Sequence, residues 1–310
     1  MTGTPVEGAG AGEAGELASV SGKGVRGRLR SFASDIALTH SVFALPFAYT
    51  SAFFGARGFP GWARLGWLTL AMVGARTFAM AANRLVDRRL DALNPRTAGR
   101  ALPSGAMKAG DMLAFAAVAL AVFLFAVWQL PPLTHKLWPF ALVPLVVYPY
   151  GKRFTWGGHY LLAVAQAVGP VGAWIAVTGA WSWKAVVLGC AVGLWVGGFD
   201  VIYATQDVEA DRTVGVHSLP ADFGVAFALW ASRATHAVCA GLFAWFGVVA
   251  GAGSFYWVGL GAAAAMLAYE QSLVRPGDLS RVNRAFFTVN GVVSVAFFAF
   301  AAADVMLAAG

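Results

Sequence analysis

Six oxygen-bearing side chains stand at regular spacing in two polar stretches, each of which follows a long apolar run. These residues are Asn83, Asp87 and Asp91 in the first stretch and Asp200, Asp207 and Asp211 in the second. At 100° per residue, each set falls on one face of an α-helix. Two acidic faces at the same depth repel each other unless a cation lies between them, and such oxygen ligands suit Mg²⁺, whose coordination substrate phosphates can complete. The spacing therefore predicts a site for Mg²⁺ and a phosphate group.

A simpler interpretation of these carboxylates is a solvated network of ion pairs at the helix ends. Its basic members would be Arg88, Arg89, Arg96, Arg100 and Arg212. For a single stretch the two interpretations would be equally good. Two matching stretches on separate helices favour the metal site.

Further basic residues lie at the same expected depth. Lys152 and Arg153 end the run VVYPYGKRFT and could be ordinary inner-loop residues, but beside a metal-bound polyanion they become candidate ligands of a diphosphate or an acceptor. Lys152, Arg88 and Arg100 are the candidates to neutralise the diphosphate, with Arg100 the first choice. Tyr203, one turn before Asp207, is equally compatible with a cavity wall and with a direct role.

Arg76 lies deeper in an apolar run, on the same helical face as Asn83 and Asp87. An arginine within a membrane is costly unless it faces a polar cavity or a partner. It could bind an anionic substrate group such as a carboxylate, or pair with an acid of a neighbouring helix.

The elements that must position these residues are membrane helices. The chain has 310 residues, of which 59% are hydrophobic and 12% charged, and its mean hydropathy is +0.66. Its apolar runs have the length that crosses a bilayer as α-helix. They predict an all-α integral membrane protein of about nine transmembrane helices, at residues 33–56, 65–87, 111–131, 137–151, 160–179, 184–206, 223–250, 254–272 and 284–308.

The basic residues predict the orientation of these helices. Seventeen of the 22 lysines and arginines fall in loops on one side and four on the other, which favours an N-in, C-out topology in the cell membrane. The net charge of +7 is better explained by this asymmetry than by nucleic-acid binding. Residues 1–31 are expected to form a disordered, partly basic cytoplasmic tail, and residues 32–310 the membrane domain.

Several of these stretches together resemble the UbiA superfamily of intramembrane prenyltransferases. They are NxxxDxxxD with the following RTAGRALPSG, then YPYGKRFT and DxxYAxxDxxxD. HSVFALPFAY is similar to the first helix of the 4-hydroxybenzoate polyprenyltransferase branch. Within that branch, RTFAMAANR, GPVGAWIAVTG, WVGGFD and LSRVNRAFFTVNG look most like the enzymes of the futalosine route to menaquinone.

The resemblance implies a fold, a reaction and roles for individual residues. It implies nine helices around a central cavity, with a polar cap at the cytoplasmic mouth and a lateral opening for an isoprenoid chain. The reaction would be Mg²⁺-dependent transfer of a polyprenyl group from polyprenyl diphosphate to 1,4-dihydroxy-6-naphthoate or 4-hydroxybenzoate. One Mg²⁺ would be held by Asn83, Asp87 and Asp91, and a second by Asp207 and Asp211. Asp200 and Arg153 would position or activate the acceptor hydroxyl, and His40 matches a position near the acceptor. For the acceptor carboxylate, we expect Arg76 to be the contact.

Other functions share some of these features. Haem O synthase and chlorophyll synthase have the same kind of metal site with other acceptors. A CDP-alcohol phosphotransferase would need an Asp-Gly at the start of its acidic run, which this sequence lacks there. A transporter of anionic metabolites seldom needs two acidic faces at one membrane surface. Donor chain length and oligomeric state stay open.

Overall fold

The computed structural model describes residues 27, 32, 41–283, 285 and 289–309. Nearly all of the tail expected at residues 1–31 lies outside this part of the chain. Within the described residues there are helices but no β-strand, and the one β-bridge joins Arg275 and Asp278. The sequence-based expectation of an all-helical protein is therefore confirmed for the described chain.

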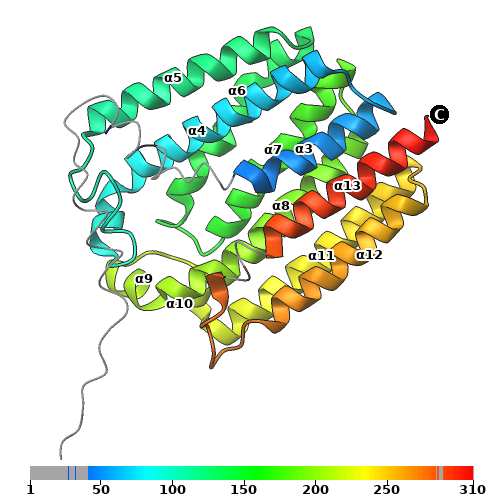
Figure 1. The fold of residues 1–310 in the computed structure, drawn as a ribbon. Coiled ribbons are helices and arrows are strands. Elements are labelled where there is room, and N and C mark those ends of the chain that lie inside the picture. The colour runs from blue at the N-terminus through cyan, green and yellow to red at the C-terminus, as the bar shows by residue number, and fades with distance from the viewer. Residues whose placement is uncertain (1–26, 28–31, 33–40, 284, 286–288, 310) are drawn as a thin grey trace, which may run out of the picture.

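Nine long helices form the described body of the protein (Figure 1). They are α3 (Ser41–Ala56), α4 (Trp62–Leu93), α5 (Ala109–Trp128), α6 (Pro132–Gly151), α7 (Gly158–Thr178), α8 (Trp183–Ala204), α11 (Val225–Ala250), α12 (Ser254–Ser272) and α13 (Asn290–Ala308). A short 3₁₀ helix, η2 (Thr205–Asp207), and the short helices α9 (Val208–Val214) and α10 (Leu219–Phe223) follow α8. Six of the long helices (α4, α5, α7, α8, α11 and α13) are long and apolar enough to span a membrane.

Two of the helix ends that differ from the sequence prediction lie beside acidic residues of the site. Helix α4 continues to Leu93, beyond the expected end at residue 87, so Asp91 lies on the same helix as Asn83 and Asp87, as their spacing predicted. The polar last turns of α4 concealed its true end, because hydrophobicity alone marked where the apolar run stopped. Helix α8 ends at Ala204, and Asp207 lies in the 3₁₀ turn η2. The backbone from Asp200 to Asp211 is therefore not the single continuous α-helix that was expected, although the three carboxylates still line one cavity.

Helix α8 occupies the middle of the bundle, between α7 on one side and α11 on the other (Figure 1). Glycines at every fourth position of α8 let it approach α7 closely. A Cβ on Gly193 would collide with the carbonyl oxygen of Ala163, and one on Gly189 would lie 2.5 Å from that of Ala167. In a membrane the hydrophobic effect does not drive helices together, so close van der Waals packing between small residues holds them instead. We call the contact of α8 with α7 along these glycines the seam. The seam fixes the helix that carries Asp200.

Candidate active site

A polar cavity of about 280 Å³ lies where the ends of α4, α6 and α8 meet the segment η2–α9 and the loops after α4 and α9. All six oxygen-bearing residues singled out by their spacing line it, namely Asn83, Asp87, Asp91, Asp200, Asp207 and Asp211. The fold therefore brings together two polar stretches that are more than a hundred residues apart.

Asp87 is almost fully buried and meets two cations from the end of α6. Lys152 Nζ lies 2.7 Å from its Oδ2, and Arg153 Nη2 lies 3.4 Å from its Oδ1. Arg153 also donates to the carbonyl oxygen of Val86 at 2.8 Å. Asn83 Nδ2 donates to Asp87 Oδ2 at 3.2 Å, as the four-residue spacing on α4 allows. The end of α6 thus neutralises the central carboxylate of α4.

Asp91 is held by the loop that follows its own helix. Arg100 Nη1 donates to its Oδ1 at 2.7 Å, while its Oδ2 is buried without a hydrogen-bond partner. Thr97 Oγ1 donates to the backbone oxygen of Asp91 at 2.9 Å. The loop thereby folds back against the last turns of α4 and presents Arg100 to the cavity.

Arg96 forms a bidentate ion pair with Asp207. Nε and Nη2 of Arg96 donate to the two carboxylate oxygens at 2.8 and 2.5 Å, and Asn94 Nδ2 adds a bond of 2.9 Å. Arg96 Nη1 also donates to the hydroxyl of Tyr203 at 2.9 Å, and its guanidinium lies over that ring at 4.9 Å. Asp211, on α9, accepts from Ser218 Oγ at 3.0 Å. The loop after α4 is therefore joined to the end of α8 by charge-assisted hydrogen bonds.

The oxygen donors suit a divalent ion that is bound together with a phosphate group. No three His, Cys, Asp or Glu side chains of the described residues lie close enough to hold a metal by themselves. The donors are nevertheless the hard oxygens that Mg²⁺ takes, and Asp91 offers a buried oxygen that lacks a partner. Mg²⁺ is usually held by one or two carboxylates plus substrate phosphates and water. The residues fit that mode of binding.

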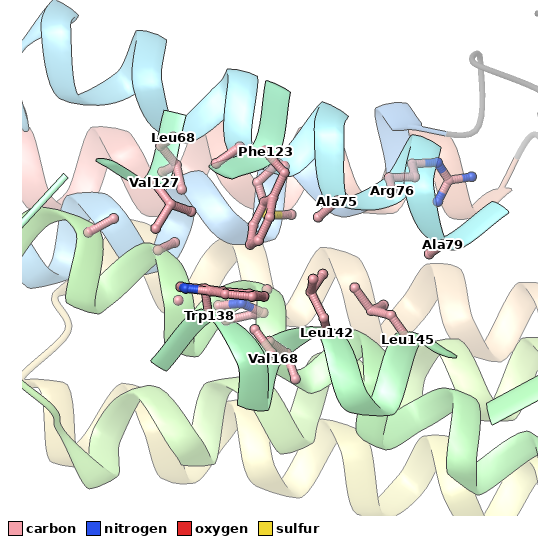
Figure 2. Close-up of a pocket in the computed structure, with 18 of the residues that line it drawn as sticks. Leu68, Ala75, Arg76, Ala79, Phe123, Val127, Trp138, Leu142, Leu145 and Val168 are labelled. Carbon is pink, nitrogen blue, oxygen red and sulfur yellow. The ribbon is translucent and has the colours of Figure 1, made fainter. Parts of the chain in front are cut away.

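A second, apolar cavity of about 170 Å³ lies between α4, α5, α6 and α7. Figure 2 shows its wall, with Arg76 at one end of a row of apolar side chains. Among the described residues no carboxylate pairs with Arg76, and its Nε is buried without a hydrogen-bond partner. Tyr148 of α6 lines both cavities, so the two spaces adjoin.

Three predicted site residues lie elsewhere. Arg88 is exposed and does not line the polar cavity, because it is one residue, or about 100°, away from Asp87 on the helix. Arg153 also lies outside the cavity lining and contacts it through Asp87. His40 lies outside the described residues. By contrast, Arg100, Lys152 and Tyr203 line the cavity as expected.

Sequence reasoning missed several residues of the cavity. Arg96 was placed only in the ion-pair alternative, and Asn94 and His159 received no role. His159 pairs with Asp200, with Nδ1 and Oδ2 2.7 Å apart. Asn94 and Arg96 follow α4 within the arginine-rich loop, which was a usable signal. His159 had none, since its partner is 41 residues away.

Known proteins match this chain over most of its length. The model of the UbiA prenyltransferase family matches residues 44–300. A 4-hydroxybenzoate octaprenyltransferase of Burkholderia multivorans is 31% identical over 245 residues, which are 79% of this chain and 85% of the relative. A counterpart of the same name from Aliivibrio fischeri is 29% identical over 81% of this chain and 87% of its own.

Solved structures agree with this. The apo structure of a UbiA homolog from Aeropyrum pernix K1 is 32% identical, with a TM-score of 0.77 over 85% of this chain and 97% of that one. A UbiA homolog from Archaeoglobus fulgidus, bound to GPP and Mg²⁺, shares the fold at 19% identity, with a TM-score of 0.69 over 89% and 99% of the two chains.

The fold and the site thus define a membrane-embedded enzyme with a charged mouth above an apolar cavity. The chain belongs to the UbiA prenyltransferase family, which confirms the resemblance seen in its motifs. It is an aromatic prenyltransferase.

Proposed function

We propose that this enzyme transfers a polyprenyl group from its diphosphate to a hydroxylated aromatic carboxylate in quinone biosynthesis, with Mg²⁺ as cofactor. The observation that carries the proposal is the set of carboxylates and cations around one cavity, beside an apolar cavity. Relatives named 4-hydroxybenzoate octaprenyltransferase support the acceptor class. The two acceptors expected from the motifs, 4-hydroxybenzoate and 1,4-dihydroxy-6-naphthoate, both belong to it.

The diphosphate binds in the polar cavity. Three of the basic side chains that line this cavity each form an ion pair with a carboxylate: Lys152, Arg96 and Arg100. When the donor binds, these cations can exchange the carboxylate for phosphate oxygens. Guanidinium groups match phosphate geometry particularly well. Arg88 is not part of this set, because its side chain is exposed.

Asn83, Asp87 and Asp91 would hold one Mg²⁺, and Asp207 and Asp211 a second. When bound, the ions would stabilise the negative charge that develops on the diphosphate as the allylic C1–O bond breaks. The structure of the Archaeoglobus fulgidus homolog with GPP and Mg²⁺ supports a divalent ion beside the donor. Arg153, through its contacts with Asp87 and Val86, holds this end of α4 in place.

The acceptor binds between the two cavities, with Asp200 toward its hydroxyl and Arg76 toward its carboxylate. Bond formation joins a ring carbon to C1 of the isoprenoid; the C1–O electron pair leaves with the diphosphate, and the ring carbon loses its proton. The apolar cavity excludes water from the allylic cation, which would otherwise be hydrolysed. Tyr203 forms part of the wall beside Asp207.

The charge distribution supports a place for the site at the cytoplasmic face of the cell membrane. The loops that line the polar cavity belong to the side that carries most lysines and arginines. With nine spans, the N-terminus is cytoplasmic and the C-terminus lies on the opposite side. The outer surface of the bundle faces lipid, which its many exposed aromatic and aliphatic side chains favour.

The proposal is tested by incubating the purified protein with geranyl diphosphate, Mg²⁺ and each acceptor, and identifying products by mass. We expect a prenylated 4-hydroxybenzoate or 1,4-dihydroxy-6-naphthoate, and no product with haem or a chlorophyllide. Asp87→Asn and Asp207→Asn should lower turnover by about a hundredfold or more, because each removes a carboxylate that would hold Mg²⁺ beside the leaving group.

Glu209→Gln is the matched control. Glu209 lies on α9 between Asp207 and Asp211, yet it is exposed and does not line the cavity. It should retain turnover close to that of the unaltered protein. Full activity in either aspartate variant would remove that carboxylate from the metal site.

A further inference from the structure

A histidine and a carboxylate form a pair in the wall of the polar cavity. His159 is the second residue of α7, and its Nδ1 lies 2.7 Å from Oδ2 of Asp200 on α8. Both residues line the cavity, but the His159 side chain is only 8% exposed, whereas that of Asp200 is 29% exposed. The histidine therefore stands behind the carboxylate, and the carboxylate is the member of the pair that a ligand can reach.

A contact with a backbone amide indicates which ring nitrogen of the histidine carries the proton. Leu219 N, at the start of α10, donates to Nε2 of His159 across 3.5 Å. A backbone N–H can only donate, so Nε2 acts as the acceptor and the ring proton is on Nδ1. His159 then donates this proton to Asp200 in a hydrogen bond. This bond engages Oδ2 and leaves the second carboxylate oxygen, Oδ1, available to a ligand.

The histidine also connects the segment Ser218–Leu219, at the start of α10, to helices α7 and α8. Leu219 follows Ser218, whose hydroxyl donates to Asp211 at 3.0 Å. Two consecutive residues of one short segment thus contact the histidine behind Asp200 and a carboxylate of the proposed metal site. Beneath them, α7 and α8 are in close contact, since a Cβ on Gly197 would lie 3.3 Å from the carbonyl oxygen of His159. The position of the imidazole is therefore fixed from three elements.

We propose that His159 is a positioning residue that keeps the carboxylate of Asp200 directed into the cavity, where Asp200 accepts a hydrogen bond from the acceptor hydroxyl. The inference rests on the proposed function and extends it. A phenol that donates to a carboxylate has a more electron-rich ring, so it attacks the allylic carbon more readily. The donor diphosphate contacts other residues of the cavity, so its binding should not depend on His159.

The test compares three substitutions of His159 that differ in where they place a hydrogen-bond donor. In His159→Asn the amide nitrogen takes nearly the place of Nδ1, in His159→Gln it reaches the place of Nε2, and His159→Leu has no donor. We expect His159→Asn to keep most of the turnover, while the other two lower kcat/KM for the acceptor by about ten- to a hundredfold. The KM for the donor should stay unchanged in all three.

A second set of variants separates positioning from stability. In an Asp200→Asn background, His159→Gln should cause no further loss, because the residue would act only through that carboxylate. His236→Gln is the matched control: His236 is also buried against α8, where it contacts the carbonyl oxygen of Trp195, but it lies outside the cavity lining. It should lower thermal stability without changing the balance between acceptor and donor kinetics.

The outcomes are distinguishable. If His159→Asn is as impaired as His159→Leu, if the losses add to that of Asp200→Asn, or if His159→Leu is fully active, His159 does not position Asp200. Inactivity of the unaltered protein toward every acceptor would contradict the proposed function, and the role of His159 with it. An active protein whose His159 variants follow the expected order supports both.

Discussion

The arginines near the carboxylates of the polar cavity differ in exposure and in their hydrogen-bond partners. Arg100 reaches across from the loop after α4 and donates to Asp91 at 2.7 Å, whereas Arg88 extends from α4 itself and is exposed. Arg96 contacts Asp207 and Tyr203 together. An arginine therefore belongs to the site when its loop folds back against the cavity, as that of Arg96 and Arg100 does. Arg88 is next to Asp87 in the sequence but does not line the cavity.

Arg100→Ala should raise the KM for the polyprenyl diphosphate by about tenfold or more, because a charge-assisted hydrogen bond to phosphate is lost. Steady-state kinetics at fixed acceptor and Mg²⁺ measure this. Arg88→Ala is the control and should leave the KM for the donor within about twofold, as surface substitutions usually have small effects. Equal effects of the two substitutions would contradict the assignment of Arg100 to the diphosphate.

At the scale of elements, the site depends on how closely α8 packs on α7. Gly189 and Gly193 leave no room for a side chain against α7, because the nearest atoms to an added Cβ belong to the backbone of α7. Backbone atoms cannot move aside as a flexible side chain can. A methyl group added at Gly189 or Gly193 must push the two helices apart, which would also displace Asp200 from His159.

Gly193→Ala should lower the free energy of unfolding by about 1–3 kcal/mol, the usual effect of overpacking. The shift in thermal midpoint of the detergent-solubilised protein reports it. Gly261→Ala, on α12, is the matched control, because nothing lies within 4 Å of the added Cβ there. It should leave stability unchanged or slightly higher, since alanine favours helix over glycine. A Gly193→Ala protein as stable as the control would show that the seam can adjust.

The break between α8 and α9 is the second element that matters. A continuous helix through residue 214 would fix the relative directions of Asp200, Asp207 and Asp211 by helical periodicity alone. The 3₁₀ turn η2 interrupts that periodicity, and Asn94 and Arg96, from the end of α4 and the loop after it, contact Asp207. The polar cavity is therefore lined by residues from both halves of the chain.

For the whole molecule, binding of Mg²⁺ and of diphosphate should depend on each other. Mg²⁺ in proteins is usually held by one or two carboxylates together with substrate phosphates, and we expect the same of the carboxylates in this cavity. We expect Mg²⁺ and a non-reactive thio-analogue of the donor to raise the thermal midpoint together by more than the sum of their separate effects.

Asp87→Asn should abolish this joint stabilisation, and Glu209→Gln should preserve it. Removal of divalent ions with EDTA should stop turnover, and Mg²⁺ should restore it. If the shifts in thermal midpoint caused by Mg²⁺ and by the donor analogue were simply additive in the unaltered protein, the two would not bind as a unit.

The topology is a further property of the whole molecule. The proposed nine spans put the two termini on opposite sides of the membrane. A C-terminal alkaline phosphatase fusion should therefore be active in bacterial cells, and a C-terminal green fluorescent protein fusion dark. A fluorescent C-terminal fusion would contradict the odd number of spans. Fusions in the loop before α5 serve as the cytoplasmic control.

Much of the architecture could be predicted from local sequence. Each of the nine predicted helices corresponds to a long helix in the described chain, because runs of apolar residues with the length of a bilayer have few alternatives to helix. Helix ends were less predictable. The extension of α4 through Asp91 and the break at Thr205–Asp207 depend on contacts that stabilise polar turns, and hydrophobicity does not report these.

The sequence by itself determined which chemistry this protein carries. Four-residue spacing on one helix is a local property, so Asn83, Asp87 and Asp91 had to share a face, and all six oxygen-bearing residues line one cavity. Only the tertiary structure decided the partners. Lys152 meets Asp87, Arg96 meets Asp207 and His159 meets Asp200, each pair joining distant segments. Local spacing fixes direction along one helix, whereas contacts between helices depend on close packing such as that of α7 on α8, which no single segment contains.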